Sequence, residues 1–242
     1  MTDPRLAVLG ERLASINRII AVTGGKGGIG KTVIATTTAL ILKGDGFTCG
    51  LCDLDFCGPT THIVLGVEGA EPHEDKGIVP PQVCGVKYLS VVFFSQDKPT
   101  PLRGTDISNA IIELLAITRW GNLDVLVIDM PPGLSDPALD LVRFIPNAEY
   151  LVVTTSSRLA WVTTQKVVQF IKSLGLPIIG VIENLAFDGP SFVQSAVERF
   201  NLPYLGRIEF DPSVEDALGD PHKLLGTRFA TQLSNCIDRI LD

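Results

Sequence analysis

Residues 20–33 contain an apolar strand and a glycine-rich loop that ends in a lysine and a threonine. Gly25, Gly30, Lys31 and Thr32 satisfy the spacing G-x-x-x-x-G-K-[ST]. Glycines there let backbone N–H groups close around phosphate oxygens without obstruction by Cβ atoms. The lysine neutralises the outer phosphates, and the threonine hydroxyl binds Mg²⁺. The loop therefore predicts a nucleoside triphosphate site.

Three acidic residues follow predicted strands on the same side of the sheet as this loop. Asp53 and Asp55 come after the second strand, and Asp129 follows four apolar residues of the fourth. A carboxylate beside bound phosphates is repelled unless Mg²⁺ or a polarised water lies between them. The three residues are therefore expected to order the metal shell or the attacking water, with Asp129 as a Walker B acid. Taken singly, each could instead be a turn residue that ends a strand.

Lys26 is a second lysine within the glycine-rich loop. Its side chain could lie on the surface. It could also reach the triphosphate of a facing subunit and offset charge that develops on the transferred group. We expect the second arrangement, because the lysine stands so near the phosphates.

Apolar runs alternate with helical patterns along the chain. Expected strands span residues 18–22, 47–54, 88–94, 125–129, 149–154 and 178–182. Expected helices span residues 5–17, 31–42, 108–118, 136–144, 162–173, 192–200 and 229–241. Several strands are apolar throughout, as in strands buried on both faces, so the pattern predicts a single α/β domain over 1–242 with a doubly wound, mainly parallel sheet. Residues of about 66–86, rich in Gly, Pro and charge, are expected to form a long mobile or partner-facing loop.

Composition narrows the functional classes. The chain has 242 residues, is 45% hydrophobic and carries a formal net charge of -7, which argues against a broad nucleic-acid surface. No apolar run approaches the roughly 18 residues of a membrane span, and the N-terminus lacks the pattern of a secretion signal. Five cysteines without a regular framework agree with thiols in a reducing compartment. We therefore predict a cytoplasmic protein with no nucleic-acid or membrane partner.

The stretch Lys26-Gly-Gly-Ile-Gly-Lys-Thr32 resembles the deviant Walker A motif of the MinD, ParA and nitrogenase iron protein superfamily. Members of that superfamily form ATP-sandwich dimers in which the extra lysine crosses the interface. The resemblance implies ATP and Mg²⁺ as ligands and a homodimer.

Other segments resemble the Mrp branch, also called ApbC-like, of iron–sulfur cluster carrier ATPases. The matching segments are residues 53–60, 103–104, 120–121, 126–136, 183–184, 203–206 and 211–212. By this resemblance, Lys26, Lys31 and Asp55 would be catalytic, and Asp55 would position the hydrolytic water. Thr32 would bind Mg²⁺ directly, and Asp53 and Asp129 would bind it through water. The implied nucleotide-binding residues are Gly25, Gly27, Gly28, Ile29, Gly30, Lys31, Thr32, Val33, Asn184, Asp211 and Pro212. Asn184 would bond the adenine edge, although it could instead cap a helix or turn.

The cysteines depart from this family pattern. Mrp-type carriers have a C-x-x-C pair shortly after the E-N-M segment, but residues 185–192 contain no cysteine. Cys49 and Cys52 spell C-x-x-C, yet their odd offset within a strand puts them on opposite faces. Cys57, beside Asp55, is a candidate cluster or thiol site at a dimer seam, against the alternative of an incidental thiol. Whether an iron–sulfur cluster is carried therefore stays open.

The sequence thus predicts a slow, dimer-dependent ATPase switch. Its predicted role is to assist metalloprotein or iron–sulfur cluster assembly together with a client protein or a partner cluster carrier. Two alternatives are a MinD- or ParA-like positioning ATPase and a nucleotide-binding regulator without a cluster. The first would need a basic amphipathic tail or a basic patch, and the predicted last helix has no excess of positive charge.

Overall fold

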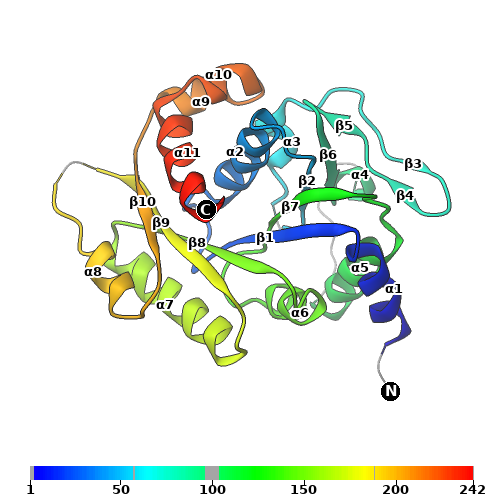
Figure 1. Ribbon diagram of the computed structural model, residues 1–242, viewed down its shortest axis with the longest axis horizontal. Helices are drawn as coiled ribbons and strands as arrows, with labels where there is room; N and C mark the ends of the chain where they lie inside the picture. Colours follow the sequence, from blue (N-terminus) through cyan, green and yellow to red (C-terminus); the bar gives the residue numbers. More distant parts are fainter. Residues whose placement is uncertain (1–2, 57, 96–103, 188, 242) are drawn as a thin grey trace.

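The computed structural model describes residues 3–56, 58–95, 104–187 and 189–241, and a sheet forms its centre (Figure 1). Within these residues, eight strands pair in the order β10-β9-β8-β1-β7-β2-β6-β5. All neighbouring strands are parallel except β5 and β6. The strands are β1 (Ile16–Gly24), β2 (Cys49–Asp53), β5 (Gln82–Val83), β6 (Val86–Ser90), β7 (Leu123–Asp129), β8 (Glu149–Thr155), β9 (Ile178–Ala186) and β10 (Tyr204–Glu209). The predicted α/β fold with a mainly parallel sheet is confirmed.

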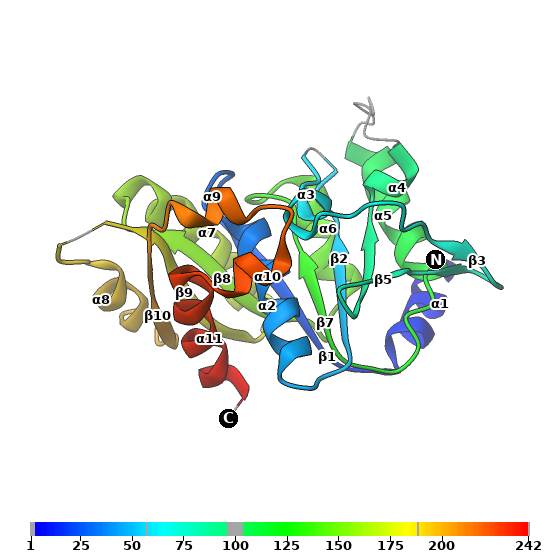
Figure 2. The same ribbon diagram turned by 90° about the horizontal axis from the view of Figure 1, so that it is seen from above.

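Helices cover both faces of the sheet (Figure 1). One face carries α2 (Lys31–Gly44), α3 (Thr61–Leu65), α9 (Ser213–Ala217), α10 (Pro221–Leu225) and α11 (Arg228–Leu241). The other carries α1 (Pro4–Leu13), α5 (Gly104–Ile117), α6 (Asp136–Phe144), α7 (Arg158–Ser173) and α8 (Val193–Glu198). Figures 1 and 2 both show α10 and α11 beside α2.

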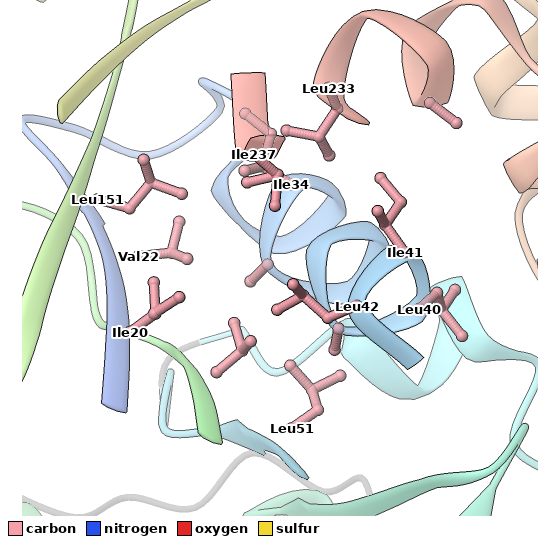
Figure 3. Close-up of a cluster of buried hydrophobic side chains, with 14 of the residues drawn as sticks. Ile20, Val22, Ile34, Leu40, Ile41, Leu42, Leu51, Leu151, Leu233 and Ile237 are labelled. Carbon is pink, nitrogen blue, oxygen red and sulfur yellow. The ribbon is translucent and has the colours of Figure 1, made fainter. Parts of the chain in front are cut away.

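Helix α2 is buried on nearly all sides, which explains why a segment rich in β-branched residues is helical. Ile34 and Leu42 of this helix face strand residues such as Leu51, while Leu233 of α11 packs from the outer side (Figure 3). Fully burying such a side chain contributes about 1.5–3 kcal/mol to folding. Tertiary packing therefore outweighs the weak helix propensity of this segment.

Several predicted boundaries differ from the structure, and two of them assign residues to the wrong kind of element. The first helix ends at Leu13, and β1 begins at Ile16, whereas a helix was predicted to Asn17. The strand predicted over 88–94 ends at Ser90, and α4 (Val92–Ser95) follows. The Ser90 hydroxyl accepts a hydrogen bond from the Val92 N–H at 3.2 Å, a local bond that favours a turn over continued pairing.

Two regions contain strands that the sequence did not predict. Within residues 66–86, β3 (His73–Glu74) and β4 (Ile78–Val79) form a hairpin, and β5 follows. Arg119 holds this hairpin, because its N–H donates to the Ile78 carbonyl at 2.7 Å and its guanidinium pairs with Asp75 at 2.6 Å. The second region is the edge strand β10, whose alternation of buried and half-buried residues is weaker than the apolar pattern of the central strands.

Candidate functional site

The glycine-rich loop joins the end of β1 to the start of α2. Gly30 is the N-cap of α2, with φ +83°, and Gly28 has φ +73°. These left-handed conformations suit glycine. The loop therefore curves around the N-terminus of α2. Free backbone N–H groups and the helix dipole favour a bound anion at that position. The geometry therefore fits a phosphate group.

Neighbouring backbone leaves room only for glycine at two further positions. A Cβ on Gly25 would lie 2.2 Å from the Thr164 nitrogen of α7, and one on Gly24 would lie 2.7 Å from the Val153 carbonyl oxygen. The Gly133 N–H, beyond the end of β7, donates to the Gly24 carbonyl at 3.0 Å. The start of the loop therefore packs against α7 on one side and is hydrogen-bonded to the segment after β7 on the other.

The carboxylates predicted at the strand ends do lie together. Asp53 and Asp129 are register partners on β2 and β7, and both are buried. Asp53 is held by Thr61, whose hydroxyl and N–H donate at 2.7 and 3.2 Å, and by the Asp55 N–H at 3.1 Å. The Ser90 hydroxyl lies at 3.4 Å. Burial raises the pKa of Asp53, and these hydrogen bonds oppose the rise.

Asp129 has a different environment. Both of its carboxylate oxygens are buried, and neither accepts a well-formed hydrogen bond from the described residues, although the Thr32 hydroxyl lies near enough to interact weakly. Burial and the neighbouring Asp53 raise the pKa of Asp129 to about 7, while the Thr32 hydroxyl and Lys31 ammonium lower it. Lys31 is itself 6% exposed. An unpartnered buried carboxylate beside a hydroxyl and a phosphate loop fits a Mg²⁺ site, with Thr32 as a direct ligand and Asp129 nearby.

The remaining catalytic candidates lie closer to solvent. Lys26, Gly27 and Gly28 form the exposed tip of the loop. Asp55 is half-buried, two residues beyond the end of β2. The site thus combines a buried charge cluster with an exposed lysine on the same loop.

A pocket of about 360 Å³ opens beside Gly30. It is lined by predicted site residues, namely Gly30, Val33, Asn184, Asp211 and Pro212, together with other residues of β9, β10 and the segments that follow them. Asn184 is buried, and its Nδ2 donates to the Ile29 carbonyl at 2.9 Å, while its Oδ1 has no partner among the described residues. The structure therefore brings Asn184, Asp211 and Pro212, which are predicted nucleotide-binding residues, to one cavity next to the loop.

Asp211 lines this pocket, but its carboxylate is already engaged. One oxygen accepts from the Ser213 hydroxyl at 2.7 Å, and the other accepts from the Phe229 N–H at 3.0 Å. These bonds lower the pKa of Asp211. In this structure the side chain fixes the start of α9 and α11.

Some residues of the site were not identified from sequence. Thr61 and Ser90 hold Asp53, and their contacts connect segments distant from it in the chain. Phe210 lines the pocket beside Gly30. The sequence could have indicated Phe210 only through its position directly before the predicted Asp211-Pro212 pair.

The cysteines do not form a metal site in the described chain. Cys49 packs in the core on the α2 face and Cys52 in the core on the α5 face, which confirms that they point to opposite sides. Burial raises the pKa of Cys49 to about 11 and raises that of Cys52 further. The candidate Cys57 lies outside the described residues. Among those that are described, no group of three or more His, Cys, Asp or Glu side chains could hold a metal ion.

None of the helices in the described parts of the chain is both long enough and apolar enough to span a bilayer.

Comparisons with known proteins agree with this fold and with the predicted family. The iron-sulfur cluster carrier protein of Pseudomonas fragi is 39% identical over 178 residues, which cover 72% of this chain and 62% of the relative. The same-named protein of Methanocaldococcus jannaschii is 31% identical over 255 residues, covering 98% of this chain and 88% of the relative. The chain covers 61% of an Aquifex aeolicus carrier and 42% of a rice chloroplast Fe-S cluster assembly factor, HCF101. It thus spans about three fifths or less of several relatives.

Solved structures share the fold. A nucleotide-binding protein from Archaeoglobus fulgidus, in complex with ADP, has a TM-score of 0.76 and 26% identity, covering 90% of this chain and 92% of that one. The cell division ATPase MinD of Pyrococcus furiosus has a TM-score of 0.70 and 23% identity, with coverage of 93% and 98%. At that identity, the likeness to MinD shows the fold alone.

A family model described as ParA, NUBPL iron-transfer P-loop NTPase, matches residues 15–242. The match begins at the turn before β1 and includes the loop, the strand-end carboxylates and the pocket beside Gly30. It confirms the resemblance to cluster-carrier ATPases, and this chain belongs to the NUBPL iron-transfer family of P-loop NTPases.

Proposed function

We propose that this protein binds and slowly hydrolyses Mg-ATP as a homodimeric switch that assists iron–sulfur cluster or metalloprotein assembly. The names of the relatives, which are cluster carriers and a cluster assembly factor, support the second part. The cluster would be cargo, passed to a client protein or exchanged with a partner carrier. The cytoplasmic location inferred from the sequence is part of the same proposal.

The observation that carries the ATP assignment is the unpartnered, buried Asp129 carboxylate beside Lys31 and Thr32. A buried carboxylate without a partner is costly unless a cation or a hydrogen-bond donor completes it. Bound Mg²⁺ would neutralise the outer phosphates, with Thr32 as its ligand and Asp53 and Asp129 reached through water.

The remaining roles follow from position. Lys31, at the first turn of α2, would neutralise the terminal phosphate from within the loop. Asp55, near Asp53 and half-buried, would orient the attacking water. Lys26 extends from the exposed tip and would reach the triphosphate of a second copy, so each site would be complete only in the dimer. Such a requirement makes hydrolysis slow.

Calorimetry with Mg-ATP tests the nucleotide site. We expect saturable binding by the wild type and severe loss in Lys31→Ala. Lys43→Ala, at the far end of the same helix, should bind like the wild type. Absence of binding by the wild type would refute the assignment.

Anaerobic reconstitution with iron and sulfide, followed by absorbance and metal counting, tests the cargo. If Cys57 of two copies holds a cluster, the wild type will gain iron and Cys57→Ser will not. An iron-free wild type would leave a partner ATPase or a nucleotide-binding regulator as the better assignment.

A further inference from the structure

Two exposed phenylalanines meet where β9 and β10 end. Phe187 is 69% exposed and Phe210 is 47% exposed. Their ring centroids are 5.7 Å apart with an interplanar angle of 31°. Aromatic rings of this size bury large areas when a partner covers them. The pair therefore leaves much apolar surface uncovered, and Phe210, but not Phe187, lines the pocket beside Gly30.

The acidic side chains that line this pocket disfavour the binding of a phosphate group there. Its ionisable lining side chains are Glu209, Asp211 and Glu215, and no lysine or arginine lines it among the described residues. Carboxylates repel a polyphosphate but tolerate a neutral heterocycle, and they favour one that carries an amino group. The chemistry thus differs from that of the adjoining loop, where Lys31 and backbone N–H groups meet an anion.

The pocket and the phosphate loop are continuous. Gly30 and Val33 line the pocket and also form the start of α2. The volume of about 360 Å³ lies at the lower end of the ~300–1,000 Å³ found for small-molecule sites. A nucleotide with its phosphates at the loop would therefore extend its base into this cavity.

The backbone at Phe210 is held without use of its ring. The Phe210 N–H donates to the Ala186 carbonyl at 2.9 Å, and its carbonyl accepts from the Arg228 guanidinium at 3.1 Å. Arg228 also pairs with Glu209 at 2.8 Å. The ring is thus presented on a fixed backbone.

The backbone at Phe187 is held in a similar way. The Arg207 guanidinium donates to the carbonyl of Phe187, and it donates to the carbonyl of Gly189 at 2.8 Å. Hydrogen bonds to main-chain carbonyls, mostly from arginine side chains, therefore fix the backbone at both phenylalanines, and both side chains remain largely exposed to a ligand.

We propose that Phe210 stacks on the base of the bound nucleotide and that Phe187, packed against Phe210, buttresses it. Stacking on a fixed aromatic face suits a purine because both partners are flat and polarisable. Asn184 Oδ1, buried and without a partner, is then available to accept a hydrogen bond from the base. This inference rests on the proposed ATP site and assigns a specificity residue within it.

Calorimetric titration with Mg-ATP and with Mg-tripolyphosphate, which lacks a base, tests the proposal. We expect Phe210→Ala to weaken ATP binding about 10-fold or more while tripolyphosphate binding is unchanged. Phe187→Ala should cause a smaller loss with the same selectivity. Phe94→Ala removes an aromatic ring that is 51% exposed and lies outside the pocket, so it should bind both ligands like the wild type.

Phe210→Leu separates stacking from simple apolar contact and guards against misfolding of the alanine variant. We expect it to remain folded, with ATP affinity well below that of the wild type. Wild-type ATP affinity in both Phe210 variants would refute stacking while leaving the phosphate site intact. Failure of the wild-type protein to bind either ligand would refute the proposed function and the stacking together.

Discussion

Asp53 and Asp129 are opposite each other at the ends of β2 and β7, yet only Asp53 is satisfied by the protein. Asp53 accepts from Thr61, Ser90 and the Asp55 backbone, whereas Asp129 has no hydrogen-bond partner among the described residues. Two buried carboxylates at paired positions of neighbouring strands repel each other when both are charged. The protein therefore fixes Asp53 in place before Mg²⁺ binds, whereas Asp129 depends on a ligand to satisfy its carboxylate.

The first prediction concerns Asp129→Asn in protein free of nucleotide and Mg²⁺. The folded-state pKa is about 7 against an ordinary value of 3.8. Because the folded protein binds this proton more tightly than the unfolded chain, the protonated carboxyl stabilises the wild-type fold. This contribution is fully present below the unfolded-state pKa of 3.8 and is lost as pH rises through the folded-state pKa of about 7. The asparagine does not titrate, so the melting temperature of the variant relative to wild type should rise between pH 5 and pH 8, by an amount on the order of a few degrees.

Thermal denaturation of both proteins across this pH range, in chelator, checks the prediction. A melting difference that is independent of pH would contradict it. The same variant should lose Mg²⁺-dependent ATP hydrolysis, because the neutral amide lacks the negative charge that would hold the water shell of Mg²⁺.

The second prediction concerns Lys26, at the exposed tip of the loop. If its charge acts on the triphosphate of the facing copy, Lys26→Ala should bind ATP normally and lose turnover, on the order of 10³-fold as for an arginine finger. Calorimetry and steady-state phosphate release measure the two quantities. Lys166→Ala, on α7, is the control for loss of a lysine and should hydrolyse ATP like the wild type. An unchanged hydrolysis rate in Lys26→Ala would contradict the proposal that Lys26 of one copy completes the ATP site of the other.

The sequence predicted the parts of this protein that depend on local pattern. Apolar runs such as residues 125–129 identified the central strands, because both of their faces are buried. The phosphate loop carries its own signature, since its left-handed conformations need glycine at Gly28 and Gly30.

Contacts between distant segments were not predictable in this way. The Thr61 hydroxyl that holds Asp53, and the Arg119 side chain that holds the hairpin of β3 and β4, belong to segments with no pattern of their own. The edge strand β10 was missed because only part of it is buried and it includes Gly206 and Arg207. Edge strands follow the pairing that the rest of the sheet offers more than their own propensity.

The third prediction concerns Gly30→Ala. A Cβ there would lie 2.3 Å from Asn184 Nδ2, and φ is +83°, so the substitution combines a clash with backbone strain. We expect a loss of about 1–3 kcal/mol in unfolding free energy without nucleotide, measured by urea denaturation. Gly27→Ala is the matched control, since φ is not positive there and its Cβ would meet nothing within 4 Å. Equal stabilities of the two variants would contradict both the clash with Asn184 and the backbone strain.

The last prediction concerns Glu183, a fully buried carboxylate that accepts from Ser156 at 2.6 Å, Ser191 at 2.8 Å and Tyr204 at 2.9 Å. These hydroxyls come from the end of β8, the segment before α8 and the start of β10. Glu183 therefore ties these three segments to β9, next to Asn184. Glu183→Gln turns one acceptor into a donor, and we expect a loss of about 1–3 kcal/mol in stability.

Hydrogen exchange distinguishes this local role of Glu183 from a general loss of stability. The Val193 N–H, which donates to the Ser191 hydroxyl at 3.0 Å, and the amides of α8 should exchange faster in Glu183→Gln, while the α2 core keeps its protection relative to global unfolding. Glu198→Gln, whose carboxylate is exposed and bonds only Gln194 among the contacts of the described chain, should match the wild type in both regions. Uniformly faster exchange across the protein would show instead that Glu183 supports the whole sheet, because the amide would then have weakened β9 pairing and not merely released the segment that Ser191 anchors.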